Sequence, residues 1–269
     1  MMKKIVRSSW LALVLLFMYL PVVILAVYSF TDTATIGTSG HFSLQNYKTL
    51  FTTGELLSMI GGTFALAFGS ALIATILGTI GAIGAFYSKK GSRRFMDFAN
   101  QIPVVNAEVV TGFSICVLLI VVLGLSKDSF FPLIVGHVVL EAPFVYLSVL
   151  PKLKQMDNSI YEAALDLGCN PKQAFFKVIL PEISPAILSA FLICLTYSID
   201  DFMISYFNCG TVETLPIAIY SMTRKKVSPE IYALSTIMFV VILCIILISN
   251  AMESRSYRRD QKALRGEGV

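Results

Sequence analysis

Six apolar stretches, each long enough to cross a lipid bilayer as a helix, constrain this chain more than any other feature. Crossing the hydrocarbon core takes roughly 20 mostly apolar residues. Charged residues make up only 14% of the chain, whereas an average soluble domain has about 25%. The sequence therefore predicts an all-α integral membrane protein with six transmembrane helices. The stretches are Trp10 to Phe30, Met59 to Tyr87, Val104 to Leu125, Pro132 to Leu150, Ala186 to Phe207 and Ile231 to Met252.

Lysine and arginine are unequally distributed over the segments that connect these stretches. Cytoplasmic segments of membrane proteins are enriched in both residues. If the N-terminus is cytoplasmic, 16 of the 21 Lys and Arg residues lie on the cytoplasmic side. The others are Lys48, Lys127, Arg224, Lys225 and Lys226. We therefore expect both termini in the cytoplasm, and we attribute the net charge of +4 to this topology and not to nucleic-acid binding.

The N-terminal stretch has some features of a secretory signal peptide, because Lys3, Lys4 and Arg7 precede it. Its ~20 apolar residues exceed a typical signal-peptide core, and no convincing small-residue cleavage site follows. We expect it to be a retained membrane anchor.

Residue types that support catalysis, metal binding or nucleotide binding are sparse in the sequence. The phosphate-binding pattern Gly-x4-Gly-Lys-Ser/Thr does not occur, so any ATP hydrolysis would come from a partner. The two histidines, His41 and His137, form no HExxH or triad-like pattern, and the five cysteines show no metal-binding or disulfide spacing. We expect no enzyme activity, no metal and no cofactor in this chain.

A polar segment, residues 159–185, separates the fourth and fifth apolar stretches and contains several helix start and stop signals. Ser159 followed by Glu162 fits a capping box, which predicts a helix that begins near Ile160. Gly168 suits the left-handed conformation that commonly ends a helix. The first half of the segment therefore predicts a short helix followed by a sharp turn.

The second half of this segment predicts another short helix. Asn170-Pro171-Lys172-Gln173 combines an N-cap residue, a first-turn proline and a capping-box partner. Pro181 is expected to end the helix, and Ser184-Pro185 to cap the next membrane span. We call residues 159–185 the elbow. The small side chains of Ala163 and Ala164 would let it fit deeply into a groove on another protein.

Four carboxylates lie within the predicted spans, at Glu108, Glu141, Asp200 and Asp201. A charged side chain at the centre of a membrane helix costs roughly 2.5 to 3.5 kcal/mol on insertion scales, so these residues should face the bundle interior, an aqueous path or a partner. We identify no basic residue in the spans that neutralises them. This imbalance favours a cationic substrate.

Structural roles for the same carboxylates remain open. Glu141 lies one helical turn after His137, so the two can form a hydrogen bond, and its position beside Pro143 also suits a kink. Neighbouring helical residues point ~100° apart, so only one of Asp200 and Asp201 can face a central path. The other is then available to cap a helix break or to bond an adjacent helix.

The elbow resembles the EAA loop by which permease subunits of bacterial ABC importers dock onto their ATPase. The resemblance lies in Glu162-Ala163-Ala164, Gly168 and Val178-Ile179-Leu180-Pro181, with Val178 where isoleucine is usual. It implies a type I importer permease fold whose coupling residues are Glu162, Ala163, Ala164, Gly168, Leu180 and Pro181.

Further runs resemble the spermidine/putrescine permeases within that family. They are Phe42 to Tyr47, Tyr197 to Phe202, Thr214 to Ile217, Ile219 to Met222 and Ser228 to Ser235. Related permeases often place an acidic residue directly after the proline that opens span three. Here Val104 follows Pro103 and the carboxylate comes at Glu108, which leaves the exact substrate open.

The resemblance implies an ATP-driven importer of polyamines in a bacterial inner membrane. Expected partners are a homologous permease subunit, an ABC ATPase dimer that binds the ATP, an external substrate-binding protein and membrane lipid. The expected parts are an anchor and external segment (1–58), a transmembrane domain (59–252) and a cytoplasmic tail (253–269). The expected path residues are Asp200, Asp201, Glu108, Glu141 and Tyr47.

Three alternatives remain compatible with the sequence. A secondary transporter for a cationic solute would also carry carboxylates inside the membrane, but it needs no elbow of this form. A membrane sensor or scaffold would keep the partner contact without a conducting path. A related ABC importer would share the fold and carry a different substrate.

Overall fold

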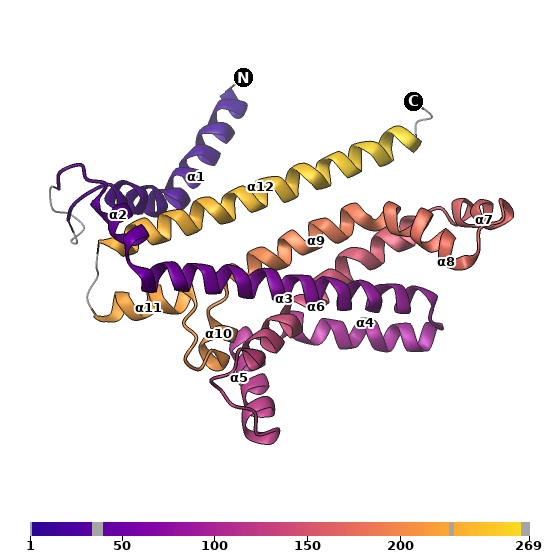
Figure 1. Ribbon diagram of the computed structural model, residues 1–269. Coiled ribbons are helices and arrows are strands. Elements are labelled where there is room, and N and C mark those ends of the chain that lie inside the picture. The colour runs from indigo at the N-terminus through magenta and orange to yellow at the C-terminus, as the bar shows by residue number, and fades with distance from the viewer. Residues whose placement is uncertain (1, 34–39, 226–228, 265–269) are drawn as a thin grey trace. The chain divides into compact units, whose positions relative to one another are not determined.

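The computed structural model describes residues 2–33, 40–225 and 229–264 (Figure 1). Every regular element within these ranges is a helix, apart from an isolated bridge between Thr31 and Phe42. The all-α prediction is therefore confirmed for the described part of the chain. Lys226, Ser228 and the tail beyond Leu264 lie outside it.

The helices follow the predicted apolar stretches, with additional short helices between them. Their bounds are α1 Met2–Ser29, α2 Gln45–Thr52, α3 Gly54–Tyr87, α4 Lys90–Val105, α5 Glu108–Cys116, α6 Phe130–Gln155, α7 Asn158–Asp166, α8 Pro171–Ala174, α9 Leu180–Asp200, α10 Met203–Asn208, α11 Leu215–Lys225 and α12 Glu230–Leu264. Wider π-helical turns follow α5, at Val117–Val122, and α8, at Phe175–Ile179.

Five helical segments within the described ranges are long and apolar enough to span a membrane. They are Ser9–Ser29, Gly54–Tyr87, Phe130–Gln155, Pro171–Asp200 and Glu230–Met252. A sixth span requires two helical pieces, Lys90–Val105 and Glu108–Val122, which meet at a bend of 103°. Six spans are therefore present if this bent pair counts as one.

The prediction that the third span is one helix from Val104 to Leu125 is wrong, because the helix is interrupted near its start. α4 ends at Val105, Asn106 and Ala107 have extended backbone conformations, and α5 begins at Glu108. Pro103 lacks the N–H that would strengthen the last turn of α4. The Asn106 side chain donates to the Thr111 hydroxyl at 3.0 Å and so bridges the break.

The chain divides into two compact units, which are described separately. The first contains the described residues of Met1–Gly61 and Ile217–Ile242. Within it, the Asn46 side chain donates to the carbonyls of Ser29 and Thr31 at 3.1 and 2.8 Å. Tyr47 lies within hydrogen-bonding distance of Ser29, with 2.9 Å between their hydroxyl oxygens. These bonds hold α2 against the end of α1.

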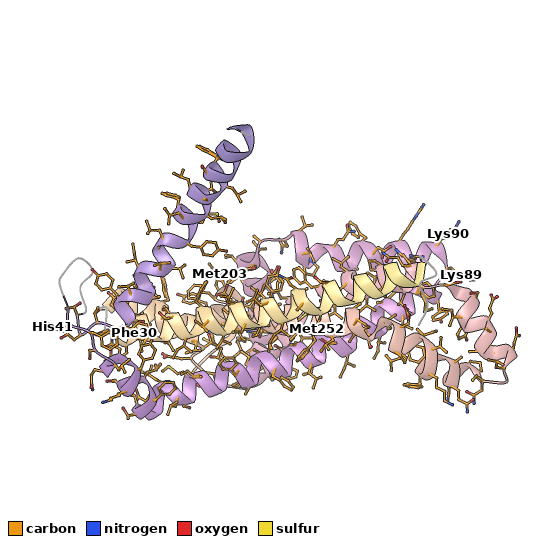
Figure 2. All side chains as sticks on the ribbon, turned by 90° about the horizontal axis from the view of Figure 1, so that it is seen from above. Phe30, His41, Lys89, Lys90, Met203 and Met252 are labelled. Atoms are coloured by element: carbon orange, nitrogen blue, oxygen red, sulfur yellow. The ribbon has the colours of Figure 1, made fainter. Side chains whose placement is uncertain are left out.

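The second unit contains Gly62–Pro216 and the described residues of Leu243–Val269. α6 packs against α4, α5, α9 and α10 in this unit. Tyr146 of α6 is almost fully buried, and its hydroxyl donates to Asp97 of α4 at 2.6 Å. Figure 2 shows Lys89 and Lys90 at the turn from α3 into α4, where both side chains are exposed.

α3 and α6 approach each other closely at Gly78. A Cβ atom at this position would lie 2.6 Å from the Val145 Cβ atom and 2.7 Å from the Ala142 carbonyl oxygen. The sequence predicts packing at Gly78, Gly81 and Gly84. The structure confirms a tight contact only for Gly78, because a Cβ at Gly81 would make an ordinary contact and one at Gly84 would meet no atom within 4 Å.

Candidate functional site

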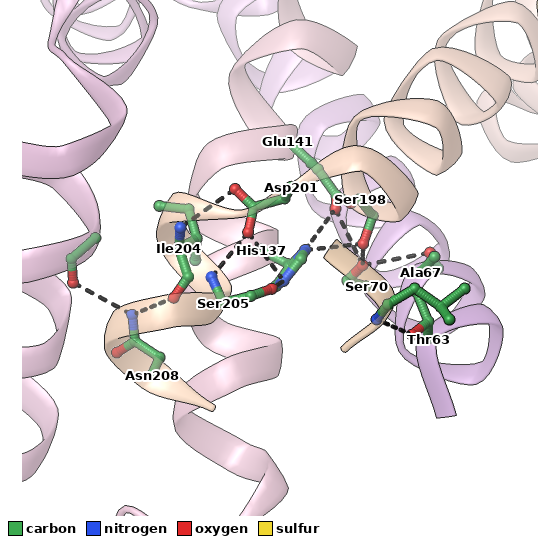
Figure 3. Close-up of polar contacts among 12 residues, drawn as sticks. Thr63, Ala67, Ser70, His137, Glu141, Ser198, Asp201, Ile204, Ser205 and Asn208 are labelled. Carbon is green, nitrogen blue, oxygen red and sulfur yellow. Dashed lines mark hydrogen bonds and ion pairs between the residues drawn. The ribbon is translucent and has the colours of Figure 1, made fainter. Parts of the chain in front are cut away.

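A cluster of buried polar side chains lies where α9 ends and α10 begins (Figure 3). All six members are at most 7% exposed, and they come from four helices and the break that follows α9. We call this group the His137 cluster. It consists of Ser70 on α3, His137 and Glu141 on α6, Ser198 on α9, Asp201 at the break and Ser205 on α10.

The imidazole ring of His137 lies at the centre of this cluster. Its Nδ1 atom is 2.8 Å from the Ser198 hydroxyl, and its Nε2 atom is 3.1 Å from the Ser205 hydroxyl. The same two nitrogens lie 3.7 Å from the Glu141 and Asp201 carboxylates, respectively. The ring therefore separates two buried carboxylates and contacts a hydroxyl on each side.

A second set of contacts extends the cluster to α3. The Ser70 hydroxyl donates to Glu141 Oε1 at 3.0 Å and lies 3.1 Å from the Ser198 hydroxyl. The other Glu141 oxygen, Oε2, is buried and has no hydrogen-bond partner among the described residues. The distance from His137 Nδ1 to Glu141 Oε1 is 3.7 Å, which is too long for a hydrogen bond. The sequence left a direct bond between these two residues open, but in the structure they are connected through the serine hydroxyls.

Asp201 explains why the predicted fifth span, Ala186 to Phe207, is wrong as one continuous helix. Its backbone is extended, and its carboxylate accepts from the backbone N–H groups of Ile204 and Ser205 at 3.2 and 2.8 Å. The carboxylate thereby satisfies two free donors at the start of α10. Asp201 thus fills the alternative role that the sequence left open, that of capping a helix break.

The remaining predicted path residues lie outside the cluster. Asp200 is exposed at the last position of α9, and Glu108 is exposed in the first turn of α5. Tyr47 belongs to the other compact unit. The structure therefore brings together two of the four carboxylates predicted within spans, Glu141 and Asp201.

The expectation that no basic residue in the spans neutralises these carboxylates stays a prediction, but the His137 imidazole lies 3.7 Å from both Glu141 and Asp201. The sequence pairs His137 only with Glu141, its neighbour on the helix. Ser70, Ser198 and Ser205 were missed entirely. Their only signal is the occurrence of small polar residues inside apolar stretches, which many membrane helices share.

The elbow has the predicted helix, turn and helix. Gly168 adopts a φ of +87°, as expected for a left-handed helix end. The N–H of Cys169 bonds the Ala164 carbonyl at 3.1 Å, and that of Gly168 bonds the Leu165 carbonyl at 2.9 Å. This pair of bonds is a Schellman motif. The predicted capping box of Asn170 and Gln173, with Pro171 in the first turn, is also confirmed.

The predicted capping box at Ser159 is wrong. The first elbow helix begins at Asn158, and Asp157 is its N-cap, with a carboxylate that accepts from the Ser159 N–H at 2.9 Å. This bond holds the pKa of Asp157 below its usual range, so the cap is ionised at neutral pH. A negative charge there also favours the positive end of the helix dipole.

Pro181 does not end the second elbow helix, which is a further correction. The chain remains helical from Pro171 to Asp200. The π-helical turn at Phe175–Ile179 and α9 follow without interruption, and proline is tolerated in the first turn of α9. The Ser184 hydroxyl donates to the Pro181 carbonyl at 2.9 Å, a carbonyl that Pro185 cannot bond because it lacks an N–H.

The elbow exposes several of the predicted coupling residues. Glu162, Ala163, Gly168 and Pro181 are exposed and Leu180 is half-buried, whereas Ala164 is buried within its own chain. Apolar side chains add to this surface. Leu167, Phe176 and Ile160 are 87%, 63% and 50% exposed. Exposed apolar side chains beside a polar loop are typical of a surface that a partner covers.

Comparison with known proteins identifies the family. The family model for the inner membrane component of binding-protein-dependent transport systems matches residues 74–259. The chain belongs to this family. Its members are transport components, which confirms the prediction of a transporter subunit and not an enzyme.

Two relatives extend the similarity over nearly the whole chain. The putrescine transport system permease protein PotI of Escherichia coli strain K12 is 33% identical, over 97% of this chain and 98% of its own length. The spermidine/putrescine transport system permease protein PotC of Haemophilus influenzae is 31% identical, over 95% and 99%.

Solved structures support the same fold. A chain of a bacterial ABC transporter involved in the import of the acidic polysaccharide alginate matches with a TM-score of 0.66, at 19% identity over 94% of this chain and 98% of that one. A chain of the MetNI methionine ABC transporter matches with a TM-score of 0.57, at 19% identity over 76% and 93%. The predicted type I permease fold is therefore confirmed.

Proposed function

We propose that this permease belongs to an ATP-driven importer of polyamines and that Asp200 contacts an amine group of the substrate. The observation that carries the proposal is the end-to-end similarity to two permeases named for putrescine and spermidine. Both compounds are flexible chains with several positive charges at neutral pH. A carboxylate is the side chain that pairs best with such a charge.

Asp200 is the strongest candidate for this contact because of its exposure. Glu141 and Asp201 are buried and already engaged in the His137 cluster. Asp200 is exposed at the end of α9, where a substrate or a second permease subunit can reach it. Glu108 and Tyr47 are proposed as further substrate contacts. Glu141 and Asp201 would not touch the substrate and would affect the path through the buried His137 cluster. In a partly dry path the attraction between amine and carboxylate is stronger than in water.

The proposed assembly is that of a binding-protein-dependent importer. The permease would pair with a homologous permease, an ABC ATPase dimer would bind the elbow from the cytoplasm, and an external binding protein would deliver the substrate. Both termini would be cytoplasmic in the bacterial inner membrane, as the lysine and arginine distribution predicts. ATP would be bound by the ATPase subunits only.

The elbow would transmit the movement of the ATPase. Closure of the ATPase dimer on ATP would draw the elbows of the two permeases together and open the path outward, and hydrolysis would reset it. Exposed Glu162, Ala163 and Gly168, together with Leu167, would form the contact. Ala164 would instead hold the first elbow helix against its own chain.

Asp200→Asn tests the proposed substrate contact. The change keeps the side-chain shape and removes the charge, and a hydrogen bond to a charged group contributes roughly 1.5 to 3 kcal/mol, so we expect kcat/KM for putrescine uptake to fall at least about tenfold. Uptake would be measured in proteoliposomes that contain matched amounts of the complete complex. The exposed loop residue Asp128 provides a control, since Asp128→Asn removes a charge away from α9.

Two results would contradict the proposal. Unchanged uptake in Asp200→Asn at normal complex content would remove Asp200 from the path. Uptake that follows a proton gradient without ATP, or a purified permease that brings no ATPase with it, would favour a secondary transporter.

A further inference from the structure

We infer that His137 is a positioning residue for transport: it holds the break between α9 and α10 through Asp201 and thereby determines where Asp200 projects. This inference rests on the proposed role of Asp200. It is carried by the contacts of α10, by the contacts on both ring nitrogens of His137, and by the adjacency of Asp200 and Asp201.

α10 packs closely against α5 and α6. A Cβ at Gly136 would lie 2.6 Å from the Ile204 Cγ2 atom, and one at Gly112 would lie 3.2 Å from the Met203 carbonyl oxygen. The Asn208 side chain donates to the Gly112 carbonyl at 3.2 Å. The two glycines therefore allow α10 to approach closely enough for Ser205 to reach His137.

The hydrogen-bond contacts on both ring nitrogens fix the orientation of the imidazole ring. Nδ1 lies 2.8 Å from the Ser198 hydroxyl, which in turn lies 3.1 Å from the Ser70 hydroxyl. The Ser70 hydroxyl is shared between Glu141 at 3.0 Å and the Ala67 carbonyl at 3.3 Å. With Nδ1 held on this side, Nε2 is turned towards Ser205 and Asp201.

His137 therefore links all four helices that meet at this break. On one side it is joined through the serines to α3 and α9, and on the other it contacts Ser205 of α10 and the Asp201 carboxylate. Removing the ring would leave Glu141 and Asp201 buried without the polar group that lies between them, which is costly. Asp201 would keep its bonds to the backbone N–H groups of Ile204 and Ser205 but would lose its contact with α6, so the break would be held less firmly.

Asp200 depends on this arrangement because it directly precedes Asp201. It is the last residue of α9, and the extended backbone of Asp201 turns the chain away from the helix at that point. If Asp201 lost its contact with His137, α9 could continue through this position as a helix, or its last turn could fray. In both cases the exposed carboxylate of Asp200 would move relative to the path.

Hydrogen exchange of the assembled complex in nanodiscs tests, without any transport measurement, whether His137 holds the break between α9 and α10. In His137→Ala, the amides of residues 203–208 are expected to exchange at least about tenfold faster, because exchange follows local opening. His41→Ala, a change in an exposed histidine of the other unit, should leave them unchanged. Equal exchange in His137→Ala and the unaltered complex would overturn the inference.

Uptake kinetics then test whether His137 acts through Asp200. His137→Ala alone should raise KM for putrescine about tenfold with a smaller change in kcat, since the contact is displaced and the ATPase coupling is not. Combined with Asp200→Asn, it should add less than about twofold, because coupled changes are not additive. Independent, multiplying effects on KM would overturn the inference.

Two additional variants keep the outcome clear. His137→Gln retains a donor and should restore part of the affinity lost in His137→Ala. If His137→Ala fails to assemble, Ser205→Ala can replace it, because it removes only the hydrogen-bond partner of Nε2. This variant should still raise KM for putrescine and accelerate exchange at residues 203–208. Normal KM together with normal exchange in Ser205→Ala would overturn the inference. If Asp200→Asn transports normally, the proposed substrate contact fails, while the exchange experiment still decides whether His137 holds the break.

Discussion

Replacing Gly78 by leucine is expected to leave almost no folded permease in the membrane. A Cβ alone would come within 2.6 Å of Val145 and 2.7 Å of the Ala142 carbonyl, so a leucine forces α3 away from α6. Overpacking typically costs about 1 to 3 kcal/mol and more where backbone must move. The measurement is the amount of monodisperse permease recovered from membranes, by immunoblot and size-exclusion chromatography.

The matched control for this variant is Gly84→Leu on the same helix. A Cβ at Gly84 meets no atom within 4 Å, so the same residue change has room there. Any effect of leucine on helix propensity is shared by the two variants, and only the contact with α6 differs. Normal recovery of Gly78→Leu would show that α3 and α6 do not pack as described.

Gly168→Asp is expected to reduce ATP-driven uptake at least about tenfold, equivalent to about 1.4 kcal/mol or more, while the ATPase still turns over. Gly168 has a φ of +87°, and apart from its two chain neighbours no described residue has an atom within 4 Å of the position where a Cβ would be placed. The strain within the chain is therefore limited to about 1 to 2 kcal/mol. A loss of coupling beyond that strain would indicate that the elbow surface contacts the proposed ATPase partner.

The loop glycine Gly124 makes this test specific. It also has a positive φ, of +66°, and open space at the Cβ position, but it lies between α5 and α6 and far along the chain from the elbow. Gly124→Asp introduces the same charge and similar backbone strain. Uptake and ATPase activity should be measured together for both variants, and coupled, near-normal transport in Gly168→Asp would contradict the docking role of the elbow.

Much of the fold was predictable because membrane spans and helix ends depend on local chemistry. The apolar stretches gave the long helices, and Gly168 and Asn170-Pro171 gave the turn and the second elbow helix. The first cap was misplaced because Asp157 and Ser159 are both good N-cap residues. α6 continues to Gln155, so the chain enters the next helix immediately, and Asp157 is the residue in the capping position.

Neither helix break was predicted from the sequence. The first, at Asn106 and Ala107, follows Pro103 and is bridged by the local bond from Asn106 to Thr111, whereas the second also involves contacts between distant segments. Asp201 caps α10 through bonds to Ile204 and Ser205, and Gly112 and Gly136 leave room for α10 to pack against α5 and α6. An uninterrupted helix was the simplest interpretation of Ala186 to Phe207, since this stretch is mostly apolar and contains no proline. Periodicity alone carries no information about a break that tertiary packing stabilises.

The candidate site was predicted only in part, for the same physical reason. The cost of a charge in the membrane identified Glu141, Asp200 and Asp201 as important. It could not show that Glu141 and Asp201 share one histidine, because Ser70, His137 and Ser205 are widely separated along the chain. The structure distinguishes the adjacent aspartates by burial, with Asp201 inside the cluster and Asp200 exposed.

The uninterrupted helix from Pro171 to Asp200 has a mechanical consequence. At about 1.5 Å per residue, its 30 residues measure roughly 45 Å. The end next to the Schellman motif of the elbow and the end that carries Asp200 therefore belong to one continuous helix. A tilt imposed at one end is transmitted to the other through the helix itself, and the places where the helix can bend are the wider turn at Phe175–Ile179 and the region of Pro181 and Pro185.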